Sequence, residues 1–536
     1  MRRSLYYTLL VYILAVVVVF PYVRWYADNP DSFQYLEIAR KYLSGNFSGA
    51  INGYWSPLIS WLLSLLLIFT SDGLLAFKIL QLIIGVFVIY QWNNLIHATD
   101  IREKWLMTLS LVIIPFIIDY ALLNLTPDLL FMGLIFLFLR ILIKGKALSS
   151  RKMALTAGLT GGFLFLTKAF GFPFFIAVII MVIIAEIYSG ISIRLYWKNI
   201  ISIFLVFFVI TFSWIAVISN KYDHFTISEA IRFNTSRDVV PLPGRTAGLP
   251  ILSEGLAIPQ DNNRSAWETP GDYVSQERVN LFTNVEEYIS VIKRNVLSIY
   301  YFDFRRQVGM FFLIFLALFI FLKGVTSLRK KWIVLSLMFI FLIYSGYSLI
   351  LVHTRYIWTG SLLMLLLGIY FISEILHAHK WRTFAYFLSA LLIIVGCKRP
   401  VKEILFTTDK DYPVYWLFQS FKHPLQTMAI FYRPDSELHE TIQDLRNKKV
   451  IDGNIASLPM RVSDRDPYTS SMRIALENDC RYFGQLVEKS DLTSQISELK
   501  AMKIDYVIAY NDEDWVSREP VYENLISKIR VYKVSP

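Results

Sequence analysis

Long apolar stretches separated by short polar connections fill residues 1–397. Eleven of them approach the roughly 20 apolar residues that a helix needs to cross a hydrocarbon core of about 30 Å. They predict membrane-spanning helices near 5–23, 74–96, 105–123, 128–143, 153–167, 170–189, 200–219, 308–322, 332–351, 357–376 and 383–397. We therefore expect a polytopic α-helical membrane protein.

A further apolar stretch, Pro57–Thr70, is shorter than a typical span and begins at a proline. Its length does not suit an untilted crossing, so it predicts a re-entrant or membrane-surface helix. Treating this stretch as a helix that does not cross also places the basic connections on one side of the membrane. If this stretch crossed the membrane, the basic connections would fall on both sides instead of one.

The basic residues of the connections orient the predicted spans. With the N-terminus in the cytoplasm, every cytoplasmic connection carries Lys or Arg, as is typical of cytoplasmic loops. These residues are Arg102, Lys104, Lys144, Lys146, Arg151, Lys152, Arg194, Lys198, Lys323, Arg329, Lys330, Lys331, Lys380 and Arg382. The C-terminus then lies outside an inner (plasma) membrane. No A-x-A-like cleavage site follows the opening stretch, so we expect it to remain as the first span.

Composition agrees with this interpretation. The 536 residues are 55% hydrophobic and 18% charged, which excludes an ordinary water-soluble protein. The net charge of +11 comes mostly from short connections, so it indicates orientation in a membrane and no nucleic-acid partner. Cys397 and Cys480 lack the spacing of a zinc site or a disulfide framework, although one bridge between them stays open.

Four regions are predicted to lie outside the cytoplasm: the loops 24–73 and 220–306, a short turn that carries Asp128, and a soluble domain, 398–536. The loop 220–306 is rich in Pro, Gly and charge around Val240–Asp272, which predicts an irregular segment with short helices. Loops of this length often cover a functional site.

The sequence of residues 398–536 predicts a small α/β domain. Strand-like runs at Lys449–Ile451, Arg481–Phe483, Tyr506–Ala509 and Arg530–Val534 alternate with helical patterns at Asp435–Arg446 and Asp491–Met502, the latter capped by Asp491. This alternation favours a mostly parallel sheet with flanking helices. The domain contains no glycine-rich phosphate loop.

The first external loop contains the strongest candidates for chemistry. From Ser32 onward it has helical periodicity, which places Asp31 at the N-cap of a helix just past the first span. An aspartate at this position commonly serves only as a cap, and Asp28 commonly remains a solvated charge.

The loop also resembles a known family. The pattern D-S-x-x-Y-x-x-I-A from Asp31, followed by Tyr54-Trp55-Ser56-Pro57-Leu58, resembles the first external loop of the GT-C glycosyltransferases. The similar branch contains the protein O-mannosyltransferases and the aminoarabinose transferases. The resemblance implies a GT-C transmembrane domain over 1–397, a polyprenyl-phosphate-linked sugar as donor, and a catalytic carboxylate at Asp31 or, second, Asp28.

Three later motifs resemble further parts of the family pattern. Asn124-Leu125-Thr126-Pro127-Asp128 is similar to its second acidic position, and Leu166-Thr167-Lys168 is similar to its lysine-containing turn. His353-Thr354-Arg355-Tyr356 is similar to its R-Y motif, although Trp358 and Thr359 stand where the family has a proline. The resemblance thus implies Asp128 as a further acidic residue of the catalytic group.

Elementary chemistry is compatible with these roles. A base must take the proton of the acceptor hydroxyl, and Asp31 is the candidate. The departing lipid phosphate needs cations, and Lys168 and Arg355 are the candidates, with His353 and Tyr356 beside them. Either cation can instead simply reach toward lipid headgroups.

Aromatic residues of the loop complete the candidate site. Tyr35, Tyr54 and Trp55 are candidates for substrate binding, and interfacial aromatics are the simpler alternative. Acidic side chains on one face can hold a divalent cation through oxygen ligands, but the similar branch requires no metal, so none is predicted.

We therefore expect a glycosyltransferase that moves a sugar from an undecaprenyl-type or dolichyl-type phosphate to a lipid, protein or glycan acceptor outside the cytoplasm. The alternatives are a transporter or flippase of an anionic lipid-linked substrate, and a catalytically silent scaffold. Paired repeats and broken helices are typical of transporters, and the sequence shows neither.

Overall fold

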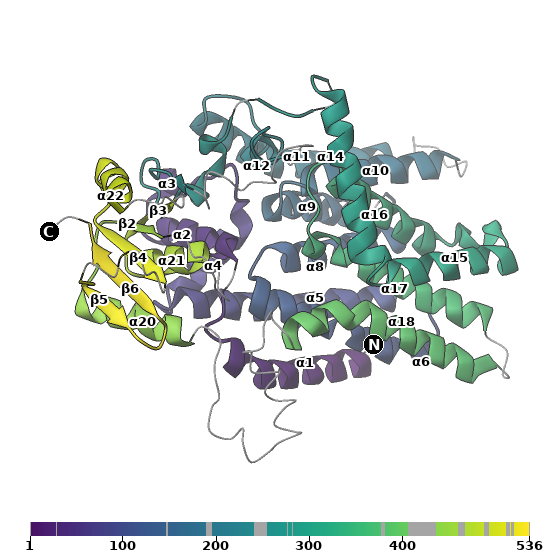
Figure 1. Cartoon of the computed structure of the whole chain (residues 1–536). Helices are drawn as coiled ribbons and strands as arrows, with labels where there is room; N and C mark the ends of the chain where they lie inside the picture. Colours follow the sequence, from purple (N-terminus) through teal and green to yellow (C-terminus); the bar gives the residue numbers. More distant parts are fainter. Residues whose placement is uncertain are drawn as a thin grey trace, which may run out of the picture.

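The structure is a computed structural model of the chain, and most of the sequence can be described in it. The described residues are 2–27, 29–145, 148–188, 196–240, 255–275, 277–280, 282–376, 381–405, 436–458, 467–486, 492–510, 515 and 519–534. Within them, a bundle of long helices carries a small sheet at one end (Figure 1).

The bundle is built from the apolar stretches of residues 1–405. Its long helices are α1 (Arg2–Val23), α5 (Gly73–Ile96), α6 (Glu103–Val112) continued by α7 (Ile114–Asp119) and η1 (Tyr120–Asn124), α8 (Asp128–Ile143), α9 (Arg151–Thr167), α10 (Gly171–Tyr188), α11 (Trp197–Lys221), α15 (Gly309–Lys323), α16 (Lys331–Ser348), α17 (Thr354–Ile375) and α18 (Arg382–Leu405). Helix α17 lies at the centre, since nearly all of its residues from Ile357 to Ser373 are buried.

The structure is that of a multi-pass membrane protein. Eight described helical segments are long and apolar enough to cross a membrane, or nine if the bent pair formed by 285–304 and 309–323 is one span. Three predicted spans coincide with the shorter helices α8, α9 and α15, which have 16, 17 and 15 residues. At 1.5 Å per residue these helices fall short of a 30 Å core, so the count of eleven stays a prediction.

The first external loop forms three short helices: α2 (Pro30–Leu43), α3 (Phe47–Ala50) and α4 (Pro57–Leu67). Helix α4 is apolar and has 11 residues, as the stretch Pro57–Thr70 suggested for a helix that does not cross. It packs against α2 and α5. These contacts fix α2 over one end of the bundle.

The cap of α2 differs from the expectation. Asn29 is the N-cap, and its side chain accepts a hydrogen bond from the Asp31 backbone N–H. Pro30 takes the first helical position, for which its fixed φ and missing N–H are suited, so the helix begins before Asp31. The Asp31 side chain is therefore not the cap and is available for other contacts.

The predicted irregular loop 220–306 contains short helices, as expected. They are α12 (Glu229–Asn234), η3 (Ala266–Glu268), η4 (Pro270–Tyr273), α14 (Val285–Ile299) and η5 (Tyr300–Phe304). Helix η3 packs against α2, and the segment also supplies a short strand, β1 (Gly255–Leu256), to the sheet of the C-terminal region.

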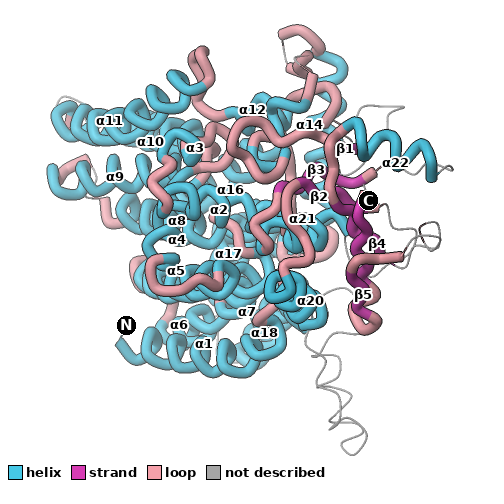
Figure 2. Tube along the Cα trace, turned by 90° about the vertical axis from the view of Figure 1, so that its left-hand side faces the viewer, coloured by secondary structure: helices cyan, strands magenta, loops and turns pink. Residues whose placement is uncertain are grey.

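Among the described residues, five strands of the C-terminal region form a sheet together with β1, in the order β1-β3-β2-β4-β6-β5. The strands are β2 (Asn454–Ser457), β3 (Arg481–Gln485), β4 (Tyr506–Tyr510), β5 (Tyr522–Asn524) and β6 (Ile529–Lys533), and the helices are α20 (Ser436–Lys448), α21 (Pro467–Glu477) and α22 (Leu492–Ala501). Alternate residues of β4 belong to different hydrophobic clusters. Ile508 is in the cluster that includes residues of α20 and α21, whereas Val507 is in the cluster that includes Leu499 of α22. Figure 2 shows the strands gathered at one side of the molecule beside these helices.

Two expectations for this region are wrong. The sheet is mixed, because β2 pairs in parallel with β3 and β4, whereas the β1–β3, β4–β6 and β5–β6 pairs are antiparallel. The first strand begins at Asn454 and not at Lys449, since Lys449 has a positive φ of 50° just after α20 ends. Asp435 and Asp491 lie outside the described residues.

Candidate functional site

Asp31 lies in the first turn of α2, where both of its carboxylate oxygens have partners. Arg355 Nη2 lies 2.8 Å from Asp31 Oδ2, and the Trp267 indole Nε1–H donates to Asp31 Oδ1 at 3.2 Å. The three residues come from α2, α17 and the 220–306 segment, which are far apart in the sequence. About 17% of the Asp31 side chain stays exposed, so solvent still reaches it.

A second acidic group lies beside the first. Asp128 begins α8 and is buried, and Lys168 Nζ lies 2.5 Å from its Oδ1. The Thr126 hydroxyl donates to Asp128 Oδ2 at 2.8 Å, and Arg355 Nε lies 3.5 Å from the same oxygen. Arg355 therefore bridges Asp31 and Asp128, and the four charged side chains form one cluster with no net formal charge.

Local backbone geometry places these residues. Leu125 is buried and has a left-handed φ of 30°, which costs energy for a residue with a branched side chain. It turns the chain sharply between η1 and α8 and so directs Thr126 and Asp128 into the cluster. At Arg355 the Tyr120 hydroxyl donates to the backbone carbonyl, which ties the start of α17 to η1.

Lys168 is held by the turn between α9 and α10. It is the C-cap of α9, with an extended backbone. A Cβ at Gly171 would lie 2.3 Å from the carbonyl carbon of Leu164, so only glycine permits this close turn. Burial lowers the pKa of Lys168 to about 8, against the opposing effect of Asp128.

The predicted partners His353 and Tyr356 also reach the cluster. The ring of Tyr356 lies under Lys168 Nζ, 3.4 Å from its centroid, and stacks on Tyr347 at 4.9 Å. His353 meets the edge of Tyr356 at 5.1 Å. Desolvation, followed by the charge of Arg355, lowers the pKa of His353 to about 4, so its ring is neutral at pH 7.

The predicted aromatic residues form a packed group beside Asp31. Trp55 meets Tyr35 and Tyr54 edge to face, with centroids 5.2 and 4.5 Å apart. Its indole N–H donates to the Trp267 carbonyl at 3.2 Å. Burial and then the charge of Asp31 raise the pKa of the Tyr35 and Tyr54 hydroxyls well above 10. Both hydroxyls thus stay protonated and can donate hydrogen bonds at physiological pH.

A buried ion pair fixes Trp267 over α2. Lys41 of α2 forms an ion pair with Glu268. The Lys41 side chain is 9% exposed and the Glu268 side chain is 1% exposed. The Asn52 amide donates to the Glu268 carbonyl at 2.7 Å, and Asn52 Oδ1 accepts the backbone N–H groups of Tyr54 and Trp55. The two external segments are therefore joined by polar contacts next to the site.

Trp267 contacts Asp31 directly and was not predicted from the sequence. It lies in an irregular segment more than 200 positions after Asp31, and no local pattern distinguishes it from the other tryptophans. Tyr120 was missed for the same reason, since it contacts the distant Arg355 backbone. The sequence also assigned no role to Tyr347, which stacks on Tyr356, or to Thr126, which donates to Asp128 two residues along the chain.

Asp28 lies outside the described residues. Among the residues that the structure describes, no group of three or more His, Cys, Asp or Glu side chains is arranged to hold a metal ion. Cys397 and Cys480 are both buried and free, so the bridge left open by the sequence is absent.

Comparison with known proteins gives no match to a family model and no match among curated proteins. Solved structures do match. The crystal structure of ArnT from Cupriavidus metallidurans bound to undecaprenyl phosphate is 11% identical, with 98% of each chain covered and a TM-score of 0.49. Its apo state is 12% identical, with 98% of this chain and 97% of that chain covered and a TM-score of 0.48.

A third match is the Archaeoglobus fulgidus oligosaccharyltransferase in complex with Zn and sulfate. It is 12% identical to this chain, of which 94% is covered, against 67% of that chain, and the TM-score is 0.46.

Proposed function

We propose that this chain is a GT-C glycosyltransferase that transfers a sugar from a polyprenyl-phosphate carrier to an acceptor on the extracytoplasmic face of the inner membrane. The observation that supports the proposal most directly is a cluster of two ion-paired acids and two cations. Arg355 contacts both Asp31 and Asp128, and Asp128 also contacts Lys168. A carboxylate beside two cations matches the needs of this reaction, because one step requires both a base and a stabilised phosphate leaving group.

Asp31 is the general base of the proposed reaction. Its carboxylate takes the proton of the acceptor hydroxyl as the hydroxyl oxygen attacks the anomeric carbon. The bond from the anomeric carbon to the phosphate oxygen breaks, and the polyprenyl phosphate leaves with the electron pair. Asp128 is hydrogen-bonded by Thr126 and paired with Lys168, so its role is to orient the cations.

Arg355 and Lys168 bind the donor phosphate. In the free protein Arg355 is paired with Asp31, which holds the carboxylate away from an acceptor. The donor phosphate is a phosphodiester with one negative charge, and its oxygens compete with Asp31 for the guanidinium; the second charge develops as the polyprenyl phosphate leaves. Donor binding thus releases Asp31, and the donor binds before the acceptor. His353 and Tyr356 line the cation side of this site.

The remaining residues position the substrates. Trp267 orients Asp31 through its indole N–H. The protonated hydroxyls of Tyr35 and Tyr54 are assigned to hydrogen bonds with the substrates. Lys168 and Arg355 supply the positive charge that the departing phosphate needs, so the proposed reaction requires no metal. Addition of a chelator should leave the activity unchanged.

A donor panel tests the proposal. Purified full-length protein is incubated with polyprenyl phosphates carrying different sugars, together with lipid, glycan and peptide acceptors, and the release of free polyprenyl phosphate is measured. Acceptor-dependent release with at least one donor is the expected result. Movement of intact donor across a vesicle membrane without release would instead support the transporter alternative, and neither activity would support the scaffold.

A further inference from the structure

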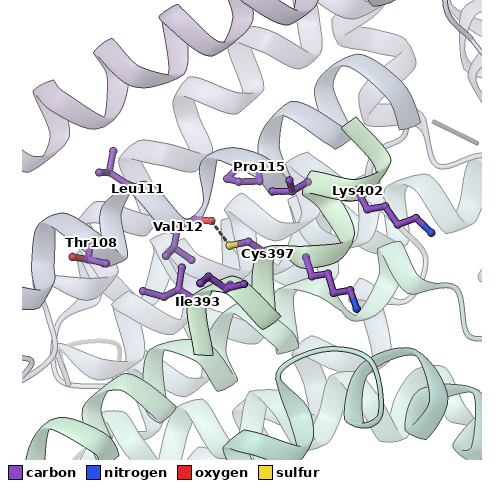
Figure 3. A pocket seen from close by; sticks show the side chains of 10 residues that line it. Thr108, Leu111, Val112, Pro115, Ile393, Cys397 and Lys402 are labelled. Carbon is purple, nitrogen blue, oxygen red and sulfur yellow. Dashed lines mark hydrogen bonds between the residues drawn. The ribbon is translucent and has the colours of Figure 1, made fainter. Parts of the chain in front are cut away.

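A groove lies between α6–α7 and α18 (Figure 3), and none of the residues that line it belongs to the cluster around Asp31. It encloses about 940 Å³. Thr108, Leu111, Val112 and Pro115 form one wall, and the stretch Ile393–Lys402 of α18 supplies the other. The Cys397 thiol contacts the Val112 carbonyl oxygen at 3.7 Å, which joins the two walls.

The groove is apolar apart from Thr108 and two cations. Lys398 and Lys402 lie four residues apart on α18, so they share one helix face, and both are exposed. Their neighbour Arg399 is engaged elsewhere, since it pairs with Glu403 at 2.7 Å and lies over the Phe302 ring. Among the described residues, no recorded ion pair includes either lysine.

The dimensions of the groove suit one half of a bilayer. The stretch from Ile393 to Lys402 rises about 13 Å along α18, which is roughly half of a 30 Å hydrocarbon core. Lys402 lies at the opposite end of the groove from Thr108 (Figure 3). It is close in sequence to Glu403, which faces Asp119, and Asp119 directly precedes Tyr120 of the candidate site. The lysines therefore lie toward the end of the bundle that carries that site.

We propose that this groove binds one anionic phospholipid of the surrounding bilayer. An acyl chain lies along the apolar walls, and the lipid phosphate lies between Lys398 and Lys402. Basic pockets between membrane helices recognise anionic headgroups in this way, because the ammonium groups reach the headgroup level while their stems cover apolar surface. Ile394, Lys398 and Lys402 of the groove are exposed on the surface of the protein, so a bilayer lipid reaches it without a path through the protein.

The site is distinct from the donor site and does not depend on the proposed function. The donor phosphate is assigned to Lys168 and Arg355, which pair with Asp128 and Asp31. Within the part of the chain that the structure describes, no such carboxylate pairs with the two lysines of the groove. A polyprenyl donor remains a competing occupant that the experiment distinguishes.

Native mass spectrometry of the full-length protein tests the inference. Phosphatidylglycerol and phosphatidylcholine are titrated in separate experiments, and retained adducts are counted. The wild-type protein should retain one phosphatidylglycerol with a preference over phosphatidylcholine of about 30-fold, as two lysines near a headgroup provide. The double variant Lys398→Gln/Lys402→Gln should lose this preference.

Two further variants make the result specific. Arg305→Gln/Arg306→Gln removes two exposed charges outside the groove and should leave the preference intact. Leu111→Trp fills the groove while keeping both lysines and should abolish the adduct. Unchanged phosphatidylglycerol retention in the lysine variant, or its displacement by an equimolar polyprenyl phosphate, would overturn the proposal.

Discussion

At the scale of single residues, the account depends on a carboxylate that does not cap its helix. Asn29 and Pro30 begin α2, which leaves Asp31 bound by Arg355 and Trp267. The sequence could predict Asp31, Asp128, Lys168 and Arg355 as a group, because each stands in a motif at the end of an apolar stretch. It could not predict Trp267 or the role of Arg355 as a bridge, since both depend on contacts between distant segments.

Replacement of Trp267 tests its role as a positioning residue. Trp267→Phe keeps the ring but removes the N–H group that donates to Asp31. A hydrogen bond to a charged group contributes about 1.5–3 kcal/mol, so kcat should fall by about 10- to 100-fold while KM for the donor changes little. Trp214→Phe, in α11 and outside the cluster, is the control. Equal kinetics for the two variants would argue against the role.

The pKa of Lys168 predicts a pH dependence of donor binding. The ammonium is charged below about pH 8 and neutral above it, and only the charged form attracts phosphate. KM for the donor should therefore be constant between pH 6 and pH 7 and rise as the pH passes through 8. Lys168→Arg stays charged over this range, so its KM should not rise. A flat wild-type profile up to pH 9 would contradict this assignment.

At the scale of elements, the length of each apolar stretch predicts the boundaries of most spans. It does not predict the short helices and strands or how distant segments pair. The predicted spans at 74–96 and 128–143 agree closely with α5 and α8. The strand at Lys449–Ile451 was predicted too early, and α21 was not predicted, because short amphipathic stretches of the C-terminal region fit a helix or a strand equally well. The strand β1 comes from the 220–306 segment and pairs with β3 of the C-terminal region. Local sequence patterns cannot predict such a pairing between distant segments.

The α9–α10 turn gives a prediction at this scale. Gly171→Ala places a methyl group against the Leu164 carbonyl and should destabilise the fold by about 1–3 kcal/mol. The shift of the turn also moves Lys168, so KM for the donor should rise. Gly271→Ala is a matched control, because its added carbon would meet only the Glu229 carbonyl oxygen, at 3.9 Å. Equal thermal midpoints for both variants would exclude a special role for Gly171.

At the scale of the whole molecule, the site and the sheet share one end of the helical bundle. The buried Arg473 of α21 donates to the Trp25 carbonyl just beyond α1, which joins the C-terminal region to the start of the first external loop. The basic connections predict that this end faces away from the cytoplasm. Orientation is encoded in charge that is spread over many loops, so it can be predicted from sequence even where individual contacts cannot.

Cysteine labelling tests this orientation in a Cys397→Ser/Cys480→Ser background. Ser48→Cys, in the first external loop, should react with a membrane-impermeant maleimide in intact cells. Ser149→Cys, between α8 and α9, should react only after permeabilisation. Both serines are exposed, so a difference in labelling reports the side of the membrane. The reverse pattern would invert the proposed topology.

We propose that Asp31 performs the chemistry while Lys168 and Arg355 hold the donor phosphate. Single-turnover release of polyprenyl phosphate, measured together with donor binding, tests it most directly. Asp31→Asn should bind the donor at least as tightly as the wild type, yet release polyprenyl phosphate about 10²- to 10⁴-fold more slowly. Lys168→Met should mainly lose affinity for the donor. Wild-type release rates in a correctly inserted Asp31→Asn protein would contradict the account.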